Sequence, residues 1–286
     1  MKLKIGIIGK GFVGSAVEFG FSAQTGGNSE IRIYDKDSSK ATHSLHETVN
    51  KSDYIFLSVP TPAKIDGSND LFILESVLYD IDAINERIDN IILIRSTVIP
   101  GTTNRLQKMY PKLNLVFNPE FLTERSAKFD FINQSRVILG GNSYVTAAVA
   151  ALYRLRFGNS LSIIETTYET AELIKYMNNC YFATKVSFMN EMKLIADTIN
   201  ADWDMAVEGF VRDGRIGHSH LNVPGPDGKA GFGGSCFPKD IQAMIAFGNQ
   251  LGIEMHTLKG AWATNLIVRP EQDWMLLKGR AISEND

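Results

Sequence analysis

The chain has 286 residues, of which 44% are hydrophobic and 21% charged, and this balance is typical of a globular protein large enough for one or two domains. The net charge of -3 gives no electrostatic reason to expect nucleic acid or a membrane surface as a partner. With only Cys180 and Cys236 a disulfide framework is excluded and no cluster of metal ligands is seen, so we expect a reducing compartment, the cytoplasm.

The amino-terminal residues predict a strand, a glycine turn and a helix. Apolar residues 3–8 are followed by the segment Gly9-Lys10-Gly11-Phe12-Val13-Gly14 and then by an amphipathic stretch, in which charged residues exclude a signal peptide or a membrane span. Glycines at this spacing allow a tight turn and let a pyrophosphate approach a helix N-terminus. A second strand, 31–34, ends at Asp35, whose carboxylate is placed to bind the ribose hydroxyls of NAD and to repel the 2′-phosphate of NADP. A glycine motif alone is weak evidence, but in this context it predicts an NAD site.

Further strands are expected at residues 54–59, 91–94, 113–117 and 137–139, with stretches between them that are long enough for crossover helices. This alternation predicts a Rossmann-type, doubly wound parallel sheet, which binds ligands at the carboxyl ends of its strands. Three segments at those ends combine proline with hydroxyl, amide or carboxylate groups. They are Val59-Pro60-Thr61-Pro62, the segment 96–102 with Thr97, and Asn118-Pro119-Glu120-Phe121-Leu122. Each alone is also typical of an ordinary turn.

A long helix is predicted for residues 167–199, because no glycine or proline interrupts 159–208 and apolar residues recur at helical spacing. Such a helix is about 45 Å long, more than a small helical domain needs, so we expect a homodimer formed along it. Lys175 and Asn179 share one of its faces, where a solvated lysine and a surface amide would be ordinary. We therefore predict an NAD-binding domain at 1–165, a small all-helical domain at 166–260 and a tail at 261–286.

The segment Gly231 to Asp240 contains the strongest candidate nucleophile. Pro238 suits the first position of a helix, so Cys236 precedes a helix N-terminus, where the dipole and Lys239 favour a thiolate. The alternatives are a buried packing cysteine and a merely capping Asp240. The preceding loop, 213–229, is predicted to contact substrate, with a flexible insertion as the alternative. Residues 256–268 are predicted to be helical and residues 277–286 to be frayed.

Taken together, these segments resemble the UDP-glucose/GDP-mannose dehydrogenase family, which oxidises the primary alcohol of a nucleotide sugar to a carboxylate. The resemblance covers residues 3 to about 265. It rests on segments in the family's order, at 9–14, 59–62, 96–98, 118–122, 171–179, 190–191, 215–217 and 231–240. Family members carry a third, carboxyl-terminal domain that helps to hold the nucleotide, and this chain stops where that domain would begin, so we expect a short form.

The resemblance implies a role for each matched residue. Cys236 would attack the aldehyde made by the first oxidation, and the adduct would be oxidised to a thioester. Lys175, with Asn179, would stabilise oxyanions, and Asp240 would assist proton transfer. Glu120 would serve thioester hydrolysis, and Thr97 would position water. The implied NAD-binding residues are Gly9, Gly11, Phe12, Val13, Gly14, Asp35, Pro60, Thr61 and Thr97, and the implied substrate-binding residues are Glu120, Phe121, Leu122, Lys175, Asn179, Arg215, Phe232 and Gly233.

These residue types suit the chemistry, since a thiolate supplies the tetrahedral adduct that hydride loss from an aldehyde requires, and a lysine can stabilise its negative oxygen. The first expectation is therefore NAD-dependent oxidation of UDP-glucose to UDP-glucuronate. Two alternatives remain. A single-step β-hydroxyacid dehydrogenase has a similar layout but needs no cysteine, and a non-catalytic dinucleotide-binding relative would not need the matched catalytic residues.

Overall fold

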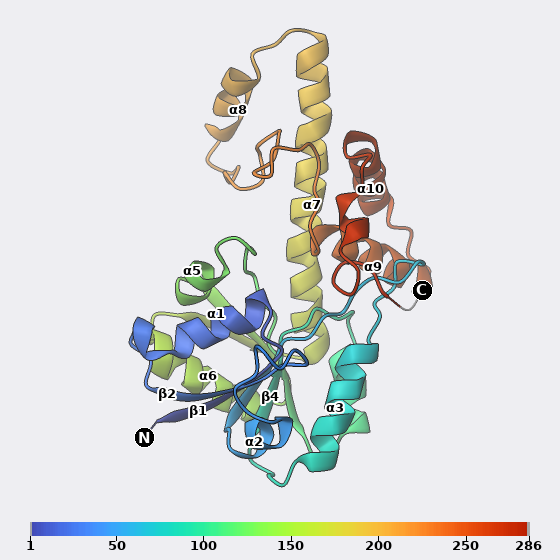
Figure 1. Ribbon diagram of the computed structural model, residues 1–286. Coiled ribbons are helices and arrows are strands. Elements are labelled where there is room, and N and C mark those ends of the chain that lie inside the picture. Colours follow the sequence, from blue (N-terminus) through green and yellow to red (C-terminus); the bar gives the residue numbers. More distant parts are fainter. Residues whose placement is uncertain (1, 285–286) are drawn as a thin grey trace. The chain divides into compact units, whose positions relative to one another are not determined.

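The computed structural model describes residues 2–284, which divide into two compact units (Figure 1). Unit 1 contains the residues up to 61 together with 71–175, and unit 2 contains 62–70 and the residues from 176 onward. The long helix α7, Tyr168–Thr198, begins in unit 1 and continues in unit 2. The domain limits 1–165, 166–260 and 261–286 stay predictions.

Unit 1 is built on one seven-stranded sheet with the order β2-β1-β3-β4-β5-β6-β7. Its strands are β1 (Leu3–Ile8), β2 (Ser29–Tyr34), β3 (Tyr54–Leu57), β4 (Ile91–Ile94), β5 (Asn114–Phe117), β6 (Arg136–Gly140) and β7 (Ser162–Thr166). The first five strands are parallel, as predicted, and the apolar centres of β1, β3, β4 and β5 are buried on both faces.

The prediction of a wholly parallel sheet is wrong at β6, which runs antiparallel to β5 and pairs with it at one position, Phe117 with Gly140. The helix α5, Ala127–Ile132, lies in the β5–β6 connection, and α6, Ser143–Phe157, joins the parallel pair β6 and β7. An apolar run predicts a strand but does not record its direction.

Helices cover both faces of the sheet, so unit 1 has three layers (Figure 1). The helices α1 (Phe12–Phe21), α5 and α6 pack on one face, where Phe21, Phe131 and Tyr153 meet in an aromatic core. The other face is covered by α2 (Leu45–Asn50), α3 (Phe72–Ile84), α4 (Thr102–Met109) and the first turns of α7. A short 3-10 helix, Ala23–Thr25, follows α1.

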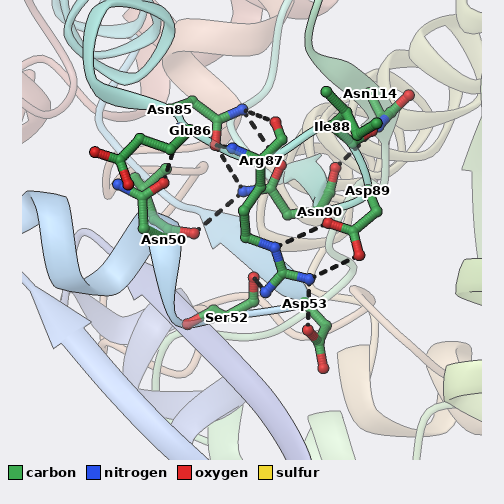
Figure 2. A network of polar contacts seen from close by, with 11 residues as sticks. Asn50, Ser52, Asp53, Asn85, Glu86, Arg87, Ile88, Asp89, Asn90 and Asn114 are labelled. Carbon is green, nitrogen blue, oxygen red and sulfur yellow. Dashed lines mark hydrogen bonds and ion pairs between the residues drawn. The ribbon is translucent and has the colours of Figure 1, made fainter.

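A polar network fastens the amino ends of β3, β4 and β5 (Figure 2). Arg87 bonds Asp53 and Asp89, each at 2.9 Å, and also donates to the carbonyl oxygen of Ser52. Asn114, at the start of β5, donates to the carbonyl oxygens of Ile88 and Asn90. The network therefore lies at the edge of the sheet opposite the carboxyl ends, where ligands of such sheets bind.

Unit 2 is helical, as predicted. Besides α7 it contains α8 (Trp203–Val211), α9 (Phe237–Gln250), α10 (His256–Val268) and a 3-10 helix at Asp273–Leu276. A small core forms around Ala183, Phe232, Ile241 and Ala261. Within residues 2–284 no helix has both the length and the apolar composition that crossing a bilayer requires.

The carboxyl-terminal segment is ordered by contacts within unit 2, so the expectation of fraying is wrong for residues 277–284, and residues 285–286 lie outside the described part. The amide of Ala63 donates to Ala281 and that of Ser283 donates to Ala63, at 2.9 and 2.7 Å between nitrogen and oxygen. The hydroxyl of Ser283 also donates to Asp70. Backbone pairing with a distant segment leaves no local pattern in the sequence.

Candidate functional site

The predicted glycine turn joins β1 to α1. A side chain at Gly9, where φ is +90°, would lie 2.4 Å from the carbonyl oxygen of Ser58, and one at Gly14 would lie 2.1 Å from that of Gly9. Both positions therefore need glycine for packing. A Cβ at Gly11 would meet no atom within 4 Å, so this glycine, the N-cap of α1, borders open space.

The start of α1 is available to an anion. Phe12 and Val13 are its first two residues, no side chain caps the helix, and its first turn holds no acidic residue. Helix N-terminal amides and the helix dipole favour phosphate there. The open approach at Gly11 and this uncapped end fit the pyrophosphate of a dinucleotide.

Asp35 follows β2 and lies beside the glycine turn. Its carboxylate accepts hydrogen bonds from the amides of Lys10, at 2.5 Å, and Asp37, at 2.9 Å. These bonds fix a half-buried carboxylate at the carboxyl end of the sheet, on the strand next to β1. This is where a ribose of a bound dinucleotide would lie.

The loops that follow β3 and β4 are tied to each other. Thr61 donates its hydroxyl to the carbonyl oxygen of Thr97 at 2.7 Å, and Ser96 donates to Val59 at 2.6 Å. The structure thus brings together the predicted residues Thr61 and Thr97, both of which are buried. Pro60, in the loop that follows β3, is exposed.

Lys175 and Glu120 form a buried ion pair within unit 1. The Lys175 Nζ donates to Glu120 Oε1 at 2.9 Å and to the Glu120 carbonyl oxygen at 2.6 Å, and the side chains are only 3% and 7% exposed. The other carboxylate oxygen accepts from the amide of Leu122. The Phe121 ring contacts two cations, with Lys175 Nζ 5.4 Å and the guanidinium carbon of Arg136 4.3 Å from its centroid. Lys175 is therefore not the solvated lysine of the ordinary interpretation.

One buried residue of this unit escaped the sequence analysis. Glu172, fully buried one turn before Lys175, accepts hydrogen bonds from the amides of Gly101 at 2.6 Å and Thr103 at 2.7 Å, and so caps α4. Burial raises the pKa of Glu172 to about 7, although these amide donors lower it. The sequence feature that could have indicated a buried Glu172 is its spacing of three residues from Lys175, which places both on the same side of the helix.

In unit 2 the carboxylate of Asp240 is held on both oxygens. Asn179 donates to Oδ2 at 2.6 Å and Lys239 to Oδ1 at 2.5 Å, and Asp240 is 1% exposed. The sequence predicts Lys239 only as a charge near Cys236, and no pattern in it indicates the contact of Lys239 with its neighbour Asp240. A buried carboxylate bound to an amide and an ammonium group can accept and return a proton at a fixed place.

Cys236 is the N-cap of α9, so it precedes the helix N-terminus as predicted, but α9 begins at Phe237 and Pro238 is its second residue rather than its first. Cys236 is partly exposed, whereas Cys180 is buried, and burial raises the pKa of the Cys180 thiol well above its usual range. Neither forms a disulfide. Cys236 is thus the accessible thiol, and Cys180 is a packing residue.

The remaining predicted substrate residues of unit 2, Arg215, Phe232 and Gly233, differ in their burial. Phe232 directs its ring into the unit 2 core, against Trp262 and Phe237, and Gly233 follows in the same loop. Arg215 is exposed and pairs with Asp213 two residues away. Unlike Asp240, Arg215 has no place in a buried cluster of this unit.

A Rossmann-type sheet with an open glycine turn and a carboxylate on the second strand defines a dinucleotide-binding domain. Two models of one family match the chain: the UDP-glucose/GDP-mannose dehydrogenase family, NAD binding domain, over residues 32–156, and its central domain over residues 169–266. The chain belongs to this family, and the first match confirms NAD as the predicted cofactor.

Named relatives agree with this assignment. The UDP-glucose 6-dehydrogenase of Rickettsia bellii is 38% identical over 213 residues, which are 72% of this chain and 47% of the relative. The UDP-glucose 6-dehydrogenase TuaD of Bacillus subtilis is 32% identical over 233 residues, 78% of this chain and 48% of the relative. A UDP-glucose dehydrogenase structure from Pyrobaculum islandicum superposes with a TM-score of 0.81 at 27% identity, covering 93% of this chain and 68% of that one. The chain thus spans about half the length of these two curated relatives.

Proposed function

We propose that the chain catalyses the NAD-dependent, four-electron oxidation of a nucleotide-sugar primary alcohol to the uronic acid, with UDP-glucose as the first substrate to test. The observation that carries the proposal is Cys236 at the N-terminus of α9, one turn before the buried Asp240. A single-step alcohol oxidation would need no such thiol, whereas oxidation of an aldehyde needs a covalent adduct. The names of the relatives support UDP-glucose.

NAD would be held by the glycine turn, with Gly9, Gly11 and Gly14, and by Phe12, Val13, Asp35, Pro60, Thr61 and Thr97. Bound NAD would supply the hydride acceptor for each of the two oxidations, and a second NAD molecule would replace the first between them. The open space at Gly11 and the uncapped start of α1 support this placement.

Cys236 would act on the aldehyde that the first oxidation leaves. Its thiolate sulfur forms a bond to the carbonyl carbon, and the oxygen becomes an oxyanion or, after protonation, a thiohemiacetal hydroxyl. Loss of the carbon-bound hydrogen as hydride then leaves a thioester. Water adds to the thioester carbon and the carbon–sulfur bond breaks, which releases the acid and returns the thiol.

The buried charged residues would serve the proton and charge transfers of these steps. Lys175 would stabilise the oxyanions, because a fixed ammonium group is worth more in a dry site than in water. Asp240, held by Asn179, would take and return protons through water, and Glu120 would serve thioester hydrolysis with Thr97 positioning the water. The burial of Lys175, Glu120 and Asp240 supports these roles.

The sugar nucleotide would be bound by Glu120, Phe121, Leu122, Lys175, Asn179, Arg215, Phe232 and Gly233. The side chain of Arg215 is 89% exposed, so its guanidinium could reach a ligand or a second subunit once its ion pair with Asp213 breaks. The buried ring of Phe232 gives this residue a packing role as well.

We also propose a homodimer formed through α7. Four large apolar residues on this helix, Met177, Tyr181, Phe188 and Ile195, are between 45% and 64% exposed. At 3.6 residues per turn they lie within roughly 40° of one another, as a single stripe. Replacing Phe188 by Glu should yield a monomer in sedimentation velocity, whereas Leu155→Glu on the exposed side of α6 should not change the sedimentation coefficient. The absence of a disulfide at Cys180 and Cys236 supports a reducing, cytoplasmic location.

The deciding experiment counts NADH per sugar consumed under anaerobic conditions. The chain is incubated with NAD and, in turn, UDP-glucose, GDP-mannose and UDP-N-acetyl sugars, with Cys236→Ser and the control Cys180→Ser alongside. Two NADH per sugar, lost in Cys236→Ser but kept in the control, are expected. One NADH would favour a single-step dehydrogenase, and NAD binding without turnover would favour a non-catalytic relative.

A further inference from the structure

The glycine loop that leads to Cys236 rests on buried polar side chains of unit 2. Asn265, on α10 and fully buried, accepts from the amide of Phe232 at 2.7 Å and donates to its carbonyl oxygen at 3.0 Å. Asn190, on α7 and 3% exposed, accepts from the amide of Gly231 at 3.0 Å. Two helices thus bind three polar atoms of the loop backbone, the amides of Gly231 and Phe232 and the carbonyl oxygen of Phe232.

Arg269 supports the same loop from the carboxyl end of α10. It is 1% exposed and donates to the carbonyl oxygen of Ala230 at 3.2 Å. Its guanidinium also binds Asp227 at 2.7 Å and Asp273 at 2.8 Å. Hydrogen bonds to Asp273 and Asp227 raise the pKa of Arg269. The same bonds hold its guanidinium in a fixed orientation. The segment 224–229 is therefore anchored through Asp227, and the alternative of a flexible insertion is wrong for it.

The glycines of the loop are explained by these side chains. A Cβ at Gly233 would lie 2.4 Å from Arg269 Nη2, and a Cβ at Gly231, where φ is +68°, would lie 2.4 Å from Asn265 Oδ1. At Gly234 a Cβ would meet nothing within 4 Å, although φ is +71° there. The loop is thus pressed against Asn265 and Arg269 on one side, and its last glycine is open on the other.

The supported loop is directly linked to the proposed nucleophile. Only Ser235 separates Gly234 from Cys236, and the carbonyl oxygen of Cys236 already accepts from the amide of Asp240 in the first turn of α9. The position of Cys236 is therefore set by α9 on its carboxyl side and by the supported loop on its amino side. A displacement of the loop can therefore reach Cys236 through a single intervening residue.

We propose that Asn265 and Arg269 are positioning residues that hold the Gly231–Gly234 loop, and through it Cys236, in the geometry required for oxidation of the sugar. Neither side chain needs to touch the substrate, because both act through the loop backbone. The inference rests on the proposed function, since it assigns the loop and Cys236 to that reaction. It extends the site to α10, which the sequence analysis treated only as a helix.

The test compares Asn265→Leu with Asn90→Leu. Both remove a buried amide that binds backbone, but Asn90 lies at the amino edge of the sheet in unit 1, where it donates to the carbonyl oxygen of Val49. The rate at which iodoacetamide alkylates Cys236 is measured from pH 6 to 10, with the labelled peptide identified by mass spectrometry, and kcat and KM for NAD and UDP-glucose are measured separately. Folding is checked by circular dichroism.

For Asn265→Leu we expect the midpoint of the alkylation profile to shift and kcat to fall at least tenfold, with the KM for NAD unchanged. Asn90→Leu should lower the unfolding midpoint but leave both readouts at wild-type values. If Asn265→Leu does not fold, Arg269→Lys, which keeps the charge and loses the planar fork, should shift the same two readouts.

An alkylation profile of wild-type shape in the variant that folds would overturn the positioning role. A wild-type chain that oxidises no nucleotide sugar would instead overturn the proposed function. The two failures can be told apart, because the alkylation profile is measured without substrate.

Discussion

Lys175 Nζ lies 2.9 Å from Glu120 Oε1, and this ion pair is almost completely withdrawn from solvent. It fastens the first turns of α7 to the loop that follows β5. Two opposite charges in a buried site compensate each other only as long as both are present. The residues proposed for oxyanion stabilisation and thioester hydrolysis therefore also stabilise unit 1, and their two roles have to be separated by experiment.

Replacing Lys175 by Met should lower the free energy of unfolding by about 3–5 kcal/mol, because the carboxylate of Glu120 is left buried without a partner. The double variant Lys175→Met/Glu120→Gln should regain most of this loss while remaining inactive. Urea denaturation and NADH release measure the two effects separately. A double variant as unstable as Lys175→Met would show that packing, and not the unpaired charge, causes the loss.

Glu172 should make the stability of the chain depend on pH. Its pKa is about 7 in the folded chain against an ordinary 4.5, so the folded state binds more protons than the unfolded state between these values. The free energy of unfolding should consequently fall as pH rises from 4.5 to 7, by up to about 1.4 kcal/mol per pH unit from this group. Urea denaturation at pH 5, 6, 7 and 8 should show this slope in the wild type and not in Glu172→Gln.

The matched control is Glu169, which precedes Glu172 on the same helix and accepts from Asn104. Its pKa is lowered, chiefly by a backbone hydrogen bond, so its contribution to stability is lost as pH falls. Glu169→Gln should therefore keep the downward slope between pH 5 and 7. Equal slopes in the wild type and Glu172→Gln would rule out Glu172 as the titrating group.

Arg87 offers a prediction about stability alone. Arg87→Ala removes bonds to Asp53, Asp89 and the Ser52 carbonyl oxygen at the amino edge of the sheet (Figure 2), and should cost about 1–2 kcal/mol of unfolding free energy. The Kd for NAD should not change, because the ligand edge is the opposite one. Arg105→Ala, which breaks a single exposed pair with Glu75, should cost less than about 0.5 kcal/mol. Weaker NAD binding in Arg87→Ala would contradict the separation of the two edges.

Local patterns predicted most of unit 1 because the features they record are local. The run 3–8, the glycine turn and Asp35 fall at the observed strand, turn and strand end, since each depends on residues close in sequence. The direction of β6 could not be predicted in this way. It depends on how the β5–β6 connection returns to the sheet, and no apolar pattern records that.

The surroundings of the candidate residues were harder to predict than their identity. The burial of Lys175 depends on Glu120, 55 positions earlier, and the order of the carboxyl-terminal segment depends on Ala63. The contacts of Asn265 and Arg269 with the glycine loop also join distant segments. A single sequence shows which residues suit a chemistry, but long-range pairing decides whether a lysine is solvated or buried.

Alanine substitutions at Gly14 and Gly11, in the turn after β1, should separate an effect on folding stability from an effect on NAD binding. Gly14→Ala places a methyl group 2.1 Å from the carbonyl oxygen of Gly9. Because the clash is with backbone, no side-chain movement relieves it, and the substitution should cost about 2–3 kcal/mol of unfolding free energy. Gly11→Ala meets no protein atom within 4 Å and has a φ of -78°, which alanine adopts, so stability should stay within about 0.5 kcal/mol.

The same Gly11→Ala methyl group points into the space assigned to the pyrophosphate, and the Kd for NAD should rise by about tenfold or more, a loss of about 1.4 kcal/mol. Calorimetric titration with NAD and urea denaturation of both variants test the contrast. A Gly11→Ala chain that binds NAD as tightly as the wild type would mean that the pyrophosphate does not approach this turn, and that Asp35 and the loops after β3 and β4 hold the cofactor elsewhere along the edge.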